Sequence, residues 1–247
     1  MSIKQFAILS VGITLSMGLG SYTPKSVGAR YGEYGEHGEF IQPLLHPPKK
    51  KRNWERIVSS NGIEVFTRDQ LESPYKEIKA TLELDCSLNT FIGVITDYPN
   101  YKNWIYATGA SDLVEKVSDL EYTMYQLIKT PWPTDDRDVC MRVKISQDEA
   151  TGKVTIINKS EPKLKPVNKG VVRVNRSDIK WEVLQTGRNK LKCNYFLNTE
   201  PGGSVPAWLI NLFIAEGPYQ SLYNLKVQQV KKAKYLGFKN PQIIEKF

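Results

Sequence analysis

The stretch Thr199-Glu-Pro-Gly-Gly-Ser-Val-Pro-Ala-Trp-Leu-Ile-Asn211 separates a strand-rich part of the chain from a helical C-terminal part. Pro201 and the pair Gly202-Gly203 predict a sharp reversal after a strand, because only glycine enters positive φ freely. Pro206 suits the first turn of a helix, where its missing N–H costs nothing. The stretch therefore predicts the end of a strand, a turn and the start of a helix.

The sequence before this stretch has the two-residue period of β-strands. In residues 78–84 apolar side chains alternate with Glu, Lys and Thr, which predicts a strand with one buried and one solvated face. Similar short segments joined by turns follow at 113–117, 122–129, 139–145, 154–158, 171–174, 179–183 and 191–197. Sequential strands with short turns imply an antiparallel sheet. Residues 88–96 have helical spacing behind Ser87 as the cap.

After Pro206 the apolar residues follow the period of a helix. One stripe contains Tyr219, Leu222, Tyr223, Val227 and Val230. Gly217-Pro218 predicts a break between a first segment and the main helix. We therefore predict an α+β fold with antiparallel strands, one internal helix and a long amphipathic C-terminal helix.

A second motif, Pro131-Trp-Pro-Thr-Asp-Asp-Arg-Asp138, lies some seventy residues before the first. In order and separation the two motifs resemble signatures of the START family, the steroidogenic acute regulatory protein-related lipid transfer domains. The resemblance covers roughly residues 54–236 and implies the helix-grip fold, a curved antiparallel sheet wrapped around the long C-terminal helix. Its motif residues are Pro131, Trp132, Pro133, Arg137, Asp138, Pro201, Gly202 and Gly203.

The resemblance also implies a hydrophobic cavity that holds one sterol, phospholipid or other lipid. Inward rows of Val, Ile, Met, Tyr and Trp could line it, but the same residues would equally build a filled core, and periodicity does not separate the two. The candidate lipid-binding residues are Trp104, Tyr125, Met141, Val143, Trp181, Tyr195, Trp208, Leu212 and Phe213.

One position departs from the START pattern. Several START domains carry an interior Arg six residues beyond the Arg of the Arg-Asp pair, and here that position is Val143. Arg142 falls one residue earlier, so on a regular strand it points to the outer face unless a bulge reverses it. We expect a cavity without this polar anchor.

The segment 207–215 is a candidate gate for the cavity. Gly202-Gly203 precede it and Gly217-Pro218 follow it, so the segment has a breaker at each end. Trp208, Leu209, Leu212 and Phe213 would cover the ligand when the gate is closed, or else simply pack in the core.

Catalytic and metal chemistry find little support in the sequence. Both histidines, His37 and His46, precede the predicted domain, and there is no phosphate-binding loop. Asp135, Asp136 and Asp138 surround Arg137 without the spacing of a calcium loop, which favours local salt bridges over a metal site. We predict a non-enzymatic protein without metal or cofactor.

Two alternatives stay open. A cyclase-like enzyme or accessory on the same scaffold would depend on Asp97, Tyr98, Tyr101 and Tyr125 as acid–base or orienting groups. A ligand-free interaction module would use the basic residues of 226–239 on membranes or partners.

The cysteines Cys86, Cys140 and Cys193 are odd in number and far apart. This excludes a disulfide framework and predicts small buried apolar residues.

The first 52 residues differ from the rest of the chain. In residues 1–30, Lys4 precedes a mostly apolar run at 6–19, which is typical of a signal peptide, with an uncleaved anchor, a transit peptide or a misassigned start as alternatives. Residues 31–52 contain a Gly-rich repeat and a basic run and predict a disordered linker, although a nuclear signal or a membrane tether would also fit the basic run. The START-like domain is assigned to 53–238 and a C-terminal tail to 239–247.

Charge and hydropathy limit the partners. The net charge of +8 divides into +4 for residues 1–52 and +4 for the remainder, too little to argue for nucleic acid. No run of eighteen apolar residues predicts a transmembrane helix. We expect a monomer that meets a lipid ligand and, transiently, a membrane surface. It would be exported, periplasmic or secreted, if the signal is real, and otherwise membrane-associated or intracellular.

Overall fold

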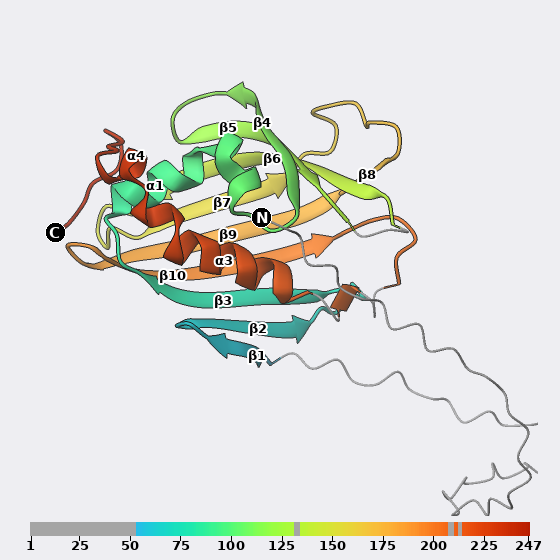
Figure 1. Ribbon diagram of the computed structural model, residues 1–247, viewed down its shortest axis with the longest axis horizontal. Coiled ribbons are helices and arrows are strands. Elements are labelled where there is room, and N and C mark those ends of the chain that lie inside the picture. Colours follow the sequence, from blue (N-terminus) through green and yellow to red (C-terminus); the bar gives the residue numbers. More distant parts are fainter. Residues whose placement is uncertain (1–52, 131–133, 207–209, 212–213) are drawn as a thin grey trace, which may run out of the picture. The chain divides into compact units, whose positions relative to one another are not determined.

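The computed structural model describes residues 53–130, 134–206, 210–211 and 214–247. They form a ten-stranded sheet with helices against one face (Figure 1). The strands are β1 (Glu55–Ser60), β2 (Ile63–Asp69), β3 (Lys76–Leu84), β4 (Thr108–Lys116), β5 (Glu121–Ile128), β6 (Asp136–Gln147), β7 (Val154–Ser160), β8 (Val171–Arg173), β9 (Arg176–Gly187) and β10 (Lys190–Glu200). The helices are α1 (Leu88–Thr96), α3 (Glu216–Val227) and α4 (Ala233–Leu236), with 3₁₀ turns η1 (Tyr98–Asn103) and η2 (Gln229–Lys231).

Nine strands pair in the order β1-β2-β3-β10-β9-β7-β6-β5-β4, and each neighbouring pair is antiparallel. The short β8 differs from the prediction because it runs parallel to β6, with Val171 opposite Asp136. β7 ends at Ser160, opposite Met141, and residues 161–170 carry the chain back past the start of β6. β8 therefore starts beside Asp136 and runs in the direction of β6.

The internal helix α1 begins where the sequence predicts. Ser87 caps it, because its Oγ accepts a hydrogen bond from the Thr90 amide at 3.1 Å. Its apolar residues Leu88, Phe91 and Ile92 are fully buried against the sheet. Since capping and periodicity agree, the sequence fixes both the start and the buried face of this helix.

The C-terminal helix α3 lies across the same face of the sheet and packs against β2 and β3 (Figure 1). It buries Leu222 and Leu225. The predicted break is present: 210–211 are helical, residues 214–215 form a turn, and α3 starts at Glu216. Gly217-Pro218 therefore occupy the first turn of α3, where proline is tolerated. A curved antiparallel sheet around a C-terminal helix confirms the α+β, helix-grip prediction.

Residues 237–247, the C-terminal strap, pack onto the domain. Ile243 is 5% exposed and belongs to the core. The Gln147 side chain pairs with the main chain of Ile244, because its Nε2 donates to the Ile244 carbonyl at 2.7 Å and its Oε1 accepts from the Ile244 amide at 2.8 Å. The Lys246 amide donates to Gln185 Oε1 at 2.9 Å. The segment predicted as a tail, 239–247, is thus a bonded part of the domain surface.

Candidate functional site

A cavity of about 220 Å³ lies between the inward face of the sheet and the start of α3. Strands β5, β6, β7, β9 and β10 form most of its wall, and the end of α1, η1, the residues after it and α3 complete it. The wall residues are Ile95, Tyr101, Trp104, Ile105, Tyr106, Gln126, Ile128, Val139, Met141, Asn158, Ser177, Ile179, Trp181, Tyr195, Leu197, Thr199, Gly217, Pro218, Ser221 and Leu222.

Aromatic rings in edge contact form part of this wall. The ring centroids of Trp181 and Tyr195 are 4.9 Å apart at 64°, and those of Tyr101 and Trp104 are 5.5 Å apart at 80°. Such pairs contribute about 0.5–1.5 kcal/mol beyond their buried area. Burial raises the pKa of the Tyr101 and Tyr195 hydroxyls, so both stay protonated at neutral pH. The wall is therefore rigid and apolar on this side.

The polar groups of the wall are all neutral. Gln126 Nε2 donates to Thr108 Oγ1 at 2.6 Å, and Ser221 Oγ accepts from the Tyr106 amide at 3.0 Å. Two buried atoms, Trp104 Nε1 and Asn158 Oδ1, have no hydrogen-bond partner among the described residues. The cavity thus combines a mostly apolar surface with a few neutral polar groups, as small-molecule sites do.

The sequence of residues 44–228 matches the START domain family. The chain belongs to this family. It is 28% identical over 180 residues to an uncharacterised protein of Pseudomonas aeruginosa, covering 73% of this chain and 88% of that protein. It is 30% identical over 179 residues to the phosphatidylcholine transfer protein of Bos taurus, covering 70% of this chain and 82% of that one.

A solved structure supports the same membership. The crystal structure of the STAR-related lipid transfer protein (fragment 25–204) from Xanthomonas axonopodis superimposes with a TM-score of 0.67 at 26% identity. It covers 72% of this chain and 99% of that one. The helix-grip architecture described above is therefore that of a START domain of the lipid-binding and lipid-transfer family.

The structure brings four of the nine predicted lipid-binding residues together in the START cavity: Trp104, Met141, Trp181 and Tyr195. Val143 is 1% exposed on the inward face of β6 but belongs to the core rather than to the cavity wall. Trp208, Leu212 and Phe213 lie outside the described residues. Contact of any of these residues with a ligand stays a prediction.

Tyr125 is a correction, because its side chain lies on the outer face of the sheet. On β5 the residues Gln126 and Ile128 line the cavity, so Tyr125 faces the other way. Its hydroxyl accepts a hydrogen bond from Asn168 Nδ2 at 3.2 Å, and Lys165 Nζ lies 4.6 Å from its ring centroid. The connection 161–170 covers this tyrosine, which explains why it is buried without facing the cavity.

The departure at Arg142 has the predicted consequence. Arg142 points outward and forms a two-pronged ion pair with Glu161, with Nε–Oε1 and Nη2–Oε2 distances of 2.5 and 3.1 Å. This contact lowers the pKa of Glu161 below its usual value. No bulge interrupts the pairing of β6 with β5 and β7 at this point. The cavity of this START domain therefore lacks an arginine at the position of Val143.

Arg137 and Asp138, the Arg-Asp pair of the Pro131–Asp138 motif, point to opposite faces of the sheet. Asp138 is fully buried on the outer side and pairs with Arg173, with Nε–Oδ1 and Nη2–Oδ2 distances of 2.7 and 3.1 Å. Arg137, 5% exposed, donates to the backbone carbonyls of Asp135 and Gly202. Asp136 pairs with Lys129 at 2.6 Å. Asp136 and Asp138 therefore form salt bridges, as predicted, but with Lys129 and Arg173 rather than with Arg137.

The Thr199–Asn211 motif makes the predicted turn. Gly202 and Gly203 have φ of +69° and +70°, values that disfavour residues with a side chain. A Cβ on Gly202 would lie 3.3 Å from Val172 Cγ1, and one on Gly203 would lie 3.4 Å from Arg137 Nη2. The turn therefore packs closely on β8 and β6, and it links the two START motifs in space. Pro131, Trp132 and Pro133 lie outside the described residues.

Sequence reasoning missed the polar part of the wall, chiefly Gln126, Asn158 and Ser177. Asn158 has the same side-chain direction as Val154 and Ile156 on β7, so it faces inward. A polar residue in phase with a buried apolar row was the available signal. Ser177 on β9 carries the same signal, because it is in phase with Trp181 and Val183.

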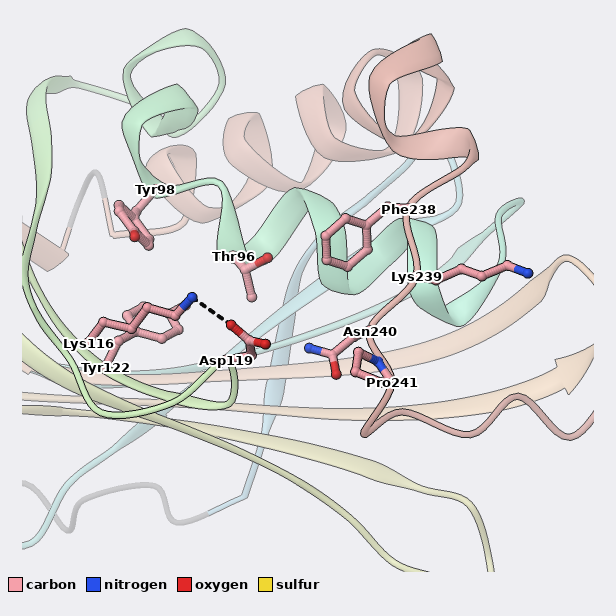
Figure 2. Close-up of a pocket in the computed structure, with 9 residues that line it drawn as sticks. All are labelled: Thr96, Tyr98, Lys116, Asp119, Tyr122, Phe238, Lys239, Asn240 and Pro241. Atoms are coloured by element: carbon pink, nitrogen blue, oxygen red, sulfur yellow. Dashed lines mark ion pairs between the residues drawn. The ribbon is translucent and has the colours of Figure 1, made fainter.

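A second pocket of about 220 Å³ lies where the β4–β5 hairpin, the end of α1 and the C-terminal strap meet (Figure 2). Figure 2 shows the ion pair between Lys116 and Asp119, 2.5 Å long, facing the strap residue Asn240. Its wall consists of Thr96, Tyr98, Lys116, Asp119, Tyr122, Phe238, Lys239, Asn240 and Pro241. Its three charged side chains, Lys116, Asp119 and Lys239, suit an apolar chain less well than the uncharged wall of the first cavity does.

The groups required by a cyclase-like alternative do not converge. Tyr98 lines the second pocket, Tyr101 lines the START cavity and Tyr125 lies on the outer face. Asp97 accepts hydrogen bonds from Tyr235 and Lys234. Within the described residues, no three His, Cys, Asp or Glu side chains come together as a metal site would require, and no helix is long and apolar enough to span a membrane.

Proposed function

We propose that this START domain binds one lipid in the cavity under α3 and transfers it between membranes without altering it chemically. The observation that carries the proposal is the uncharged, mostly apolar cavity between the sheet and α3 in a member of a lipid-transfer family. A cavity of this kind supplies what an extracted lipid needs. Withdrawing a sixteen-carbon chain from a bilayer costs roughly 13 kcal/mol at about 0.8 kcal/mol per CH₂, unless an equally dry cavity receives it.

The size of the cavity implies that it opens further to accept a lipid. About 220 Å³ exceeds the ~150 Å³ cavity that binds benzene in an engineered protein, but it is below the ~300 Å³ at which ligand pockets usually begin. A group the size of a water molecule takes up ~30 Å³, so the cavity has room for about seven such groups. A complete lipid therefore requires an element of the wall to move.

The start of α3 is the element that we propose as the gate. Gly217, Pro218 and Ser221 of its first turns lie in the wall, so their displacement opens the cavity directly. Few side-chain hydrogen bonds hold this end of α3 to the rest of the described structure: Ser221 Oγ accepts from the Tyr106 amide at 3.0 Å, Asn224 Nδ2 donates to the Trp104 carbonyl at 3.0 Å, and the Tyr219 hydroxyl accepts from Asn61 Nδ2 at 2.7 Å. The turn at Gly202-Gly203 and the break at 214–215 would let the preceding segment follow.

Native mass spectrometry of protein purified from its own host tests the binding step, and one lipid per chain is expected.

Vesicle-to-vesicle transfer of the extracted lipid tests the transfer step. Ile179 and Leu197 face each other across β9 and β10 in the wall, so Ile179→Trp should fill the cavity and reduce transfer at least tenfold. Leu184→Trp places the same ring on the outer face of β9, where Leu184 is 39% exposed, and should leave transfer unchanged. Protein without lipid, or equal transfer by both variants, would contradict the proposal.

A further inference from the structure

The cavity wall carries no charge. All twenty wall residues are neutral at pH 7. Between residues 53 and 247, the positions that the structure leaves undescribed, 131–133, 207–209 and 212–213, are Pro, Trp, Ala, Leu and Phe and carry no charge. Among residues 53–247, a ligand group buried in this cavity therefore meets no ionic partner in the wall.

Neither of the two arginines of β6 belongs to the cavity wall. Arg142 is bound to Glu161 on the outer face. Arg137 lies on the inward row with Val139 and Met141, but its guanidinium donates to the backbone carbonyls of Asp135 and Gly202. Burying a phosphate without a cation costs several kcal/mol, because the lost hydration is not replaced.

The wall nevertheless has neutral hydrogen-bonding capacity to spare. Trp104 Nε1 can donate one hydrogen bond and Asn158 Oδ1 can accept, and both are buried without a partner among the described residues. A buried polar group without a hydrogen-bond partner is destabilising. Once the cavity widens to admit a lipid, a ligand hydroxyl can accept from the indole N–H or donate to the amide oxygen.

From these three observations we infer that the cavity selects lipids whose polar end is a neutral hydroxyl, such as a fatty alcohol, a diacylglycerol or a sterol, over lipids with a phosphate headgroup. This inference rests on the proposed function and narrows its ligand class. The similarity to phosphatidylcholine transfer proteins therefore does not extend to the headgroup.

A matched pair of lipids tests the selection. Vesicles contain equal amounts of dioleoylglycerol and dioleoylphosphatidylcholine, which differ only in the headgroup, and native mass spectrometry counts the lipid bound to the recovered protein. We expect at least tenfold more dioleoylglycerol. Binding of neither lipid, together with lipid-free protein from the host, would refute the proposed function itself. Equal or preferred binding of phosphatidylcholine would overturn this inference but leave the proposed function standing. If phosphatidylcholine binding were then lost in Arg137→Gln, the headgroup would lie at the Arg137 guanidinium.

Two wall variants test the hydroxyl contacts. Asn158→Leu and Trp104→Phe keep the side chain's bulk or ring and remove the acceptor or the donor. Each should lower the binding of 1-hexadecanol relative to hexadecane roughly threefold to tenfold. Leu184→Ile, on the outer face of β9 and outside the cavity wall, should leave the ratio unchanged.

A stability measurement separates ligand recognition from a structural role. Because Asn158 Oδ1 has no partner, Asn158→Leu should raise the melting temperature of the lipid-free protein while it lowers alcohol binding. A fall in melting temperature with an unchanged binding ratio would show that Asn158 serves the fold, and would overturn its assignment to the ligand.

Discussion

Arg173 and Asp138 form an ion pair that is closed to solvent on the outer face of the sheet, with the two side chains 5% and 0% exposed. The same guanidinium donates to the backbone carbonyls of Pro162, Lys165 and Pro166. It therefore holds the connection 161–170 over β5 and β6, including the buried face of Tyr125.

Removal of one member of this pair should be strongly destabilising. Arg173→Met leaves the Asp138 carboxylate buried without a partner and releases the connection, so we expect the free energy of unfolding to fall by about 3–5 kcal/mol. Urea denaturation followed by circular dichroism measures the change. Arg176→Met is the matched control, because Arg176 and Glu200 form a pair 3.0 Å long with side chains 47% and 35% exposed. The free energy of unfolding of Arg176→Met should fall by less than about 1 kcal/mol. Equal losses in the two variants would show that burial does not make the Arg173–Asp138 pair more important for stability than an exposed pair.

The cysteines should be unreactive in the folded protein. Cys86, Cys140 and Cys193 are free and buried, as the sequence predicts, and burial raises the pKa of Cys86 to about 12. The thiolate is the reactive form, so iodoacetamide at pH 8 should label the native chain at least a hundredfold more slowly than the urea-unfolded chain. Rapid labelling of any cysteine in the native state would contradict the packing described here.

The raised pKa of Cys86 also sets a pH dependence. An unfolded cysteine titrates near ~8.5, whereas folded Cys86 titrates at about 12. Folding thus favours the protonated thiol, and the stability that this provides is complete below pH ~8.5 and is lost as the pH rises toward 12. Cys86→Ala should flatten the stability profile between pH 9 and 11, and an unchanged slope would show that other groups dominate it.

The turn that precedes α3 should control lipid exchange if the gate operates as proposed. Gly202→Ala together with Gly203→Ala introduces side chains at two positive φ angles and should slow exchange several-fold. Gly152→Ala is the control, because Gly152 also has a positive φ of +73° but lies in the β6–β7 turn, where an added Cβ would meet the Lys246 side chain rather than Val172 or Arg137. Exchange of a fluorescent lipid between vesicles is the measurement. Slowing by Gly152→Ala to the same extent would attribute the effect to general strain.

The first thirty residues make a separate prediction. If the apolar run after Lys4 is a signal peptide, protein recovered from the host should begin near Gly20 or Ala29. N-terminal sequencing and fractionation of the host cells check this. An intact Met1 in a cytosolic fraction would exclude export.

Alternation along strands was a reliable guide where one face of the strand is solvated. On β6 it placed Val143 inside and Arg142 outside, because the outward side chains Arg142 and Lys144 remain in contact with solvent. It could not orient Tyr125, because residues 122–126 of β5 are buried on both faces. The connection 161–170 that covers Tyr125 is far from it in sequence, so the local pattern around Tyr125 does not predict the contact.

Long-range pairs were beyond local reasoning for the same reason. The partner of Asp138 is 35 residues away, across a connection whose path depends on the complete sheet. The turn at Gly202-Gly203 and the cap at Ser87 were predictable, because each depends on the backbone preferences of a few adjacent residues. The wall of the cavity is predictable only in part. Its apolar rows follow from the two-residue period, but the grouping of its neutral polar atoms depends on which strands are neighbours in the sheet.

Gln147 holds the strap by hydrogen bonds to the main chain of Ile244 rather than to its side chain. It satisfies both the amide and the carbonyl of Ile244, whose own side chain is 67% exposed. Any residue that tolerates an extended backbone fits there, so this position offers an insertion point for a spectroscopic label. Phe247 is 65% exposed, so a reporter domain can be fused behind it at the strap, which contributes no residue to the wall of the cavity under α3.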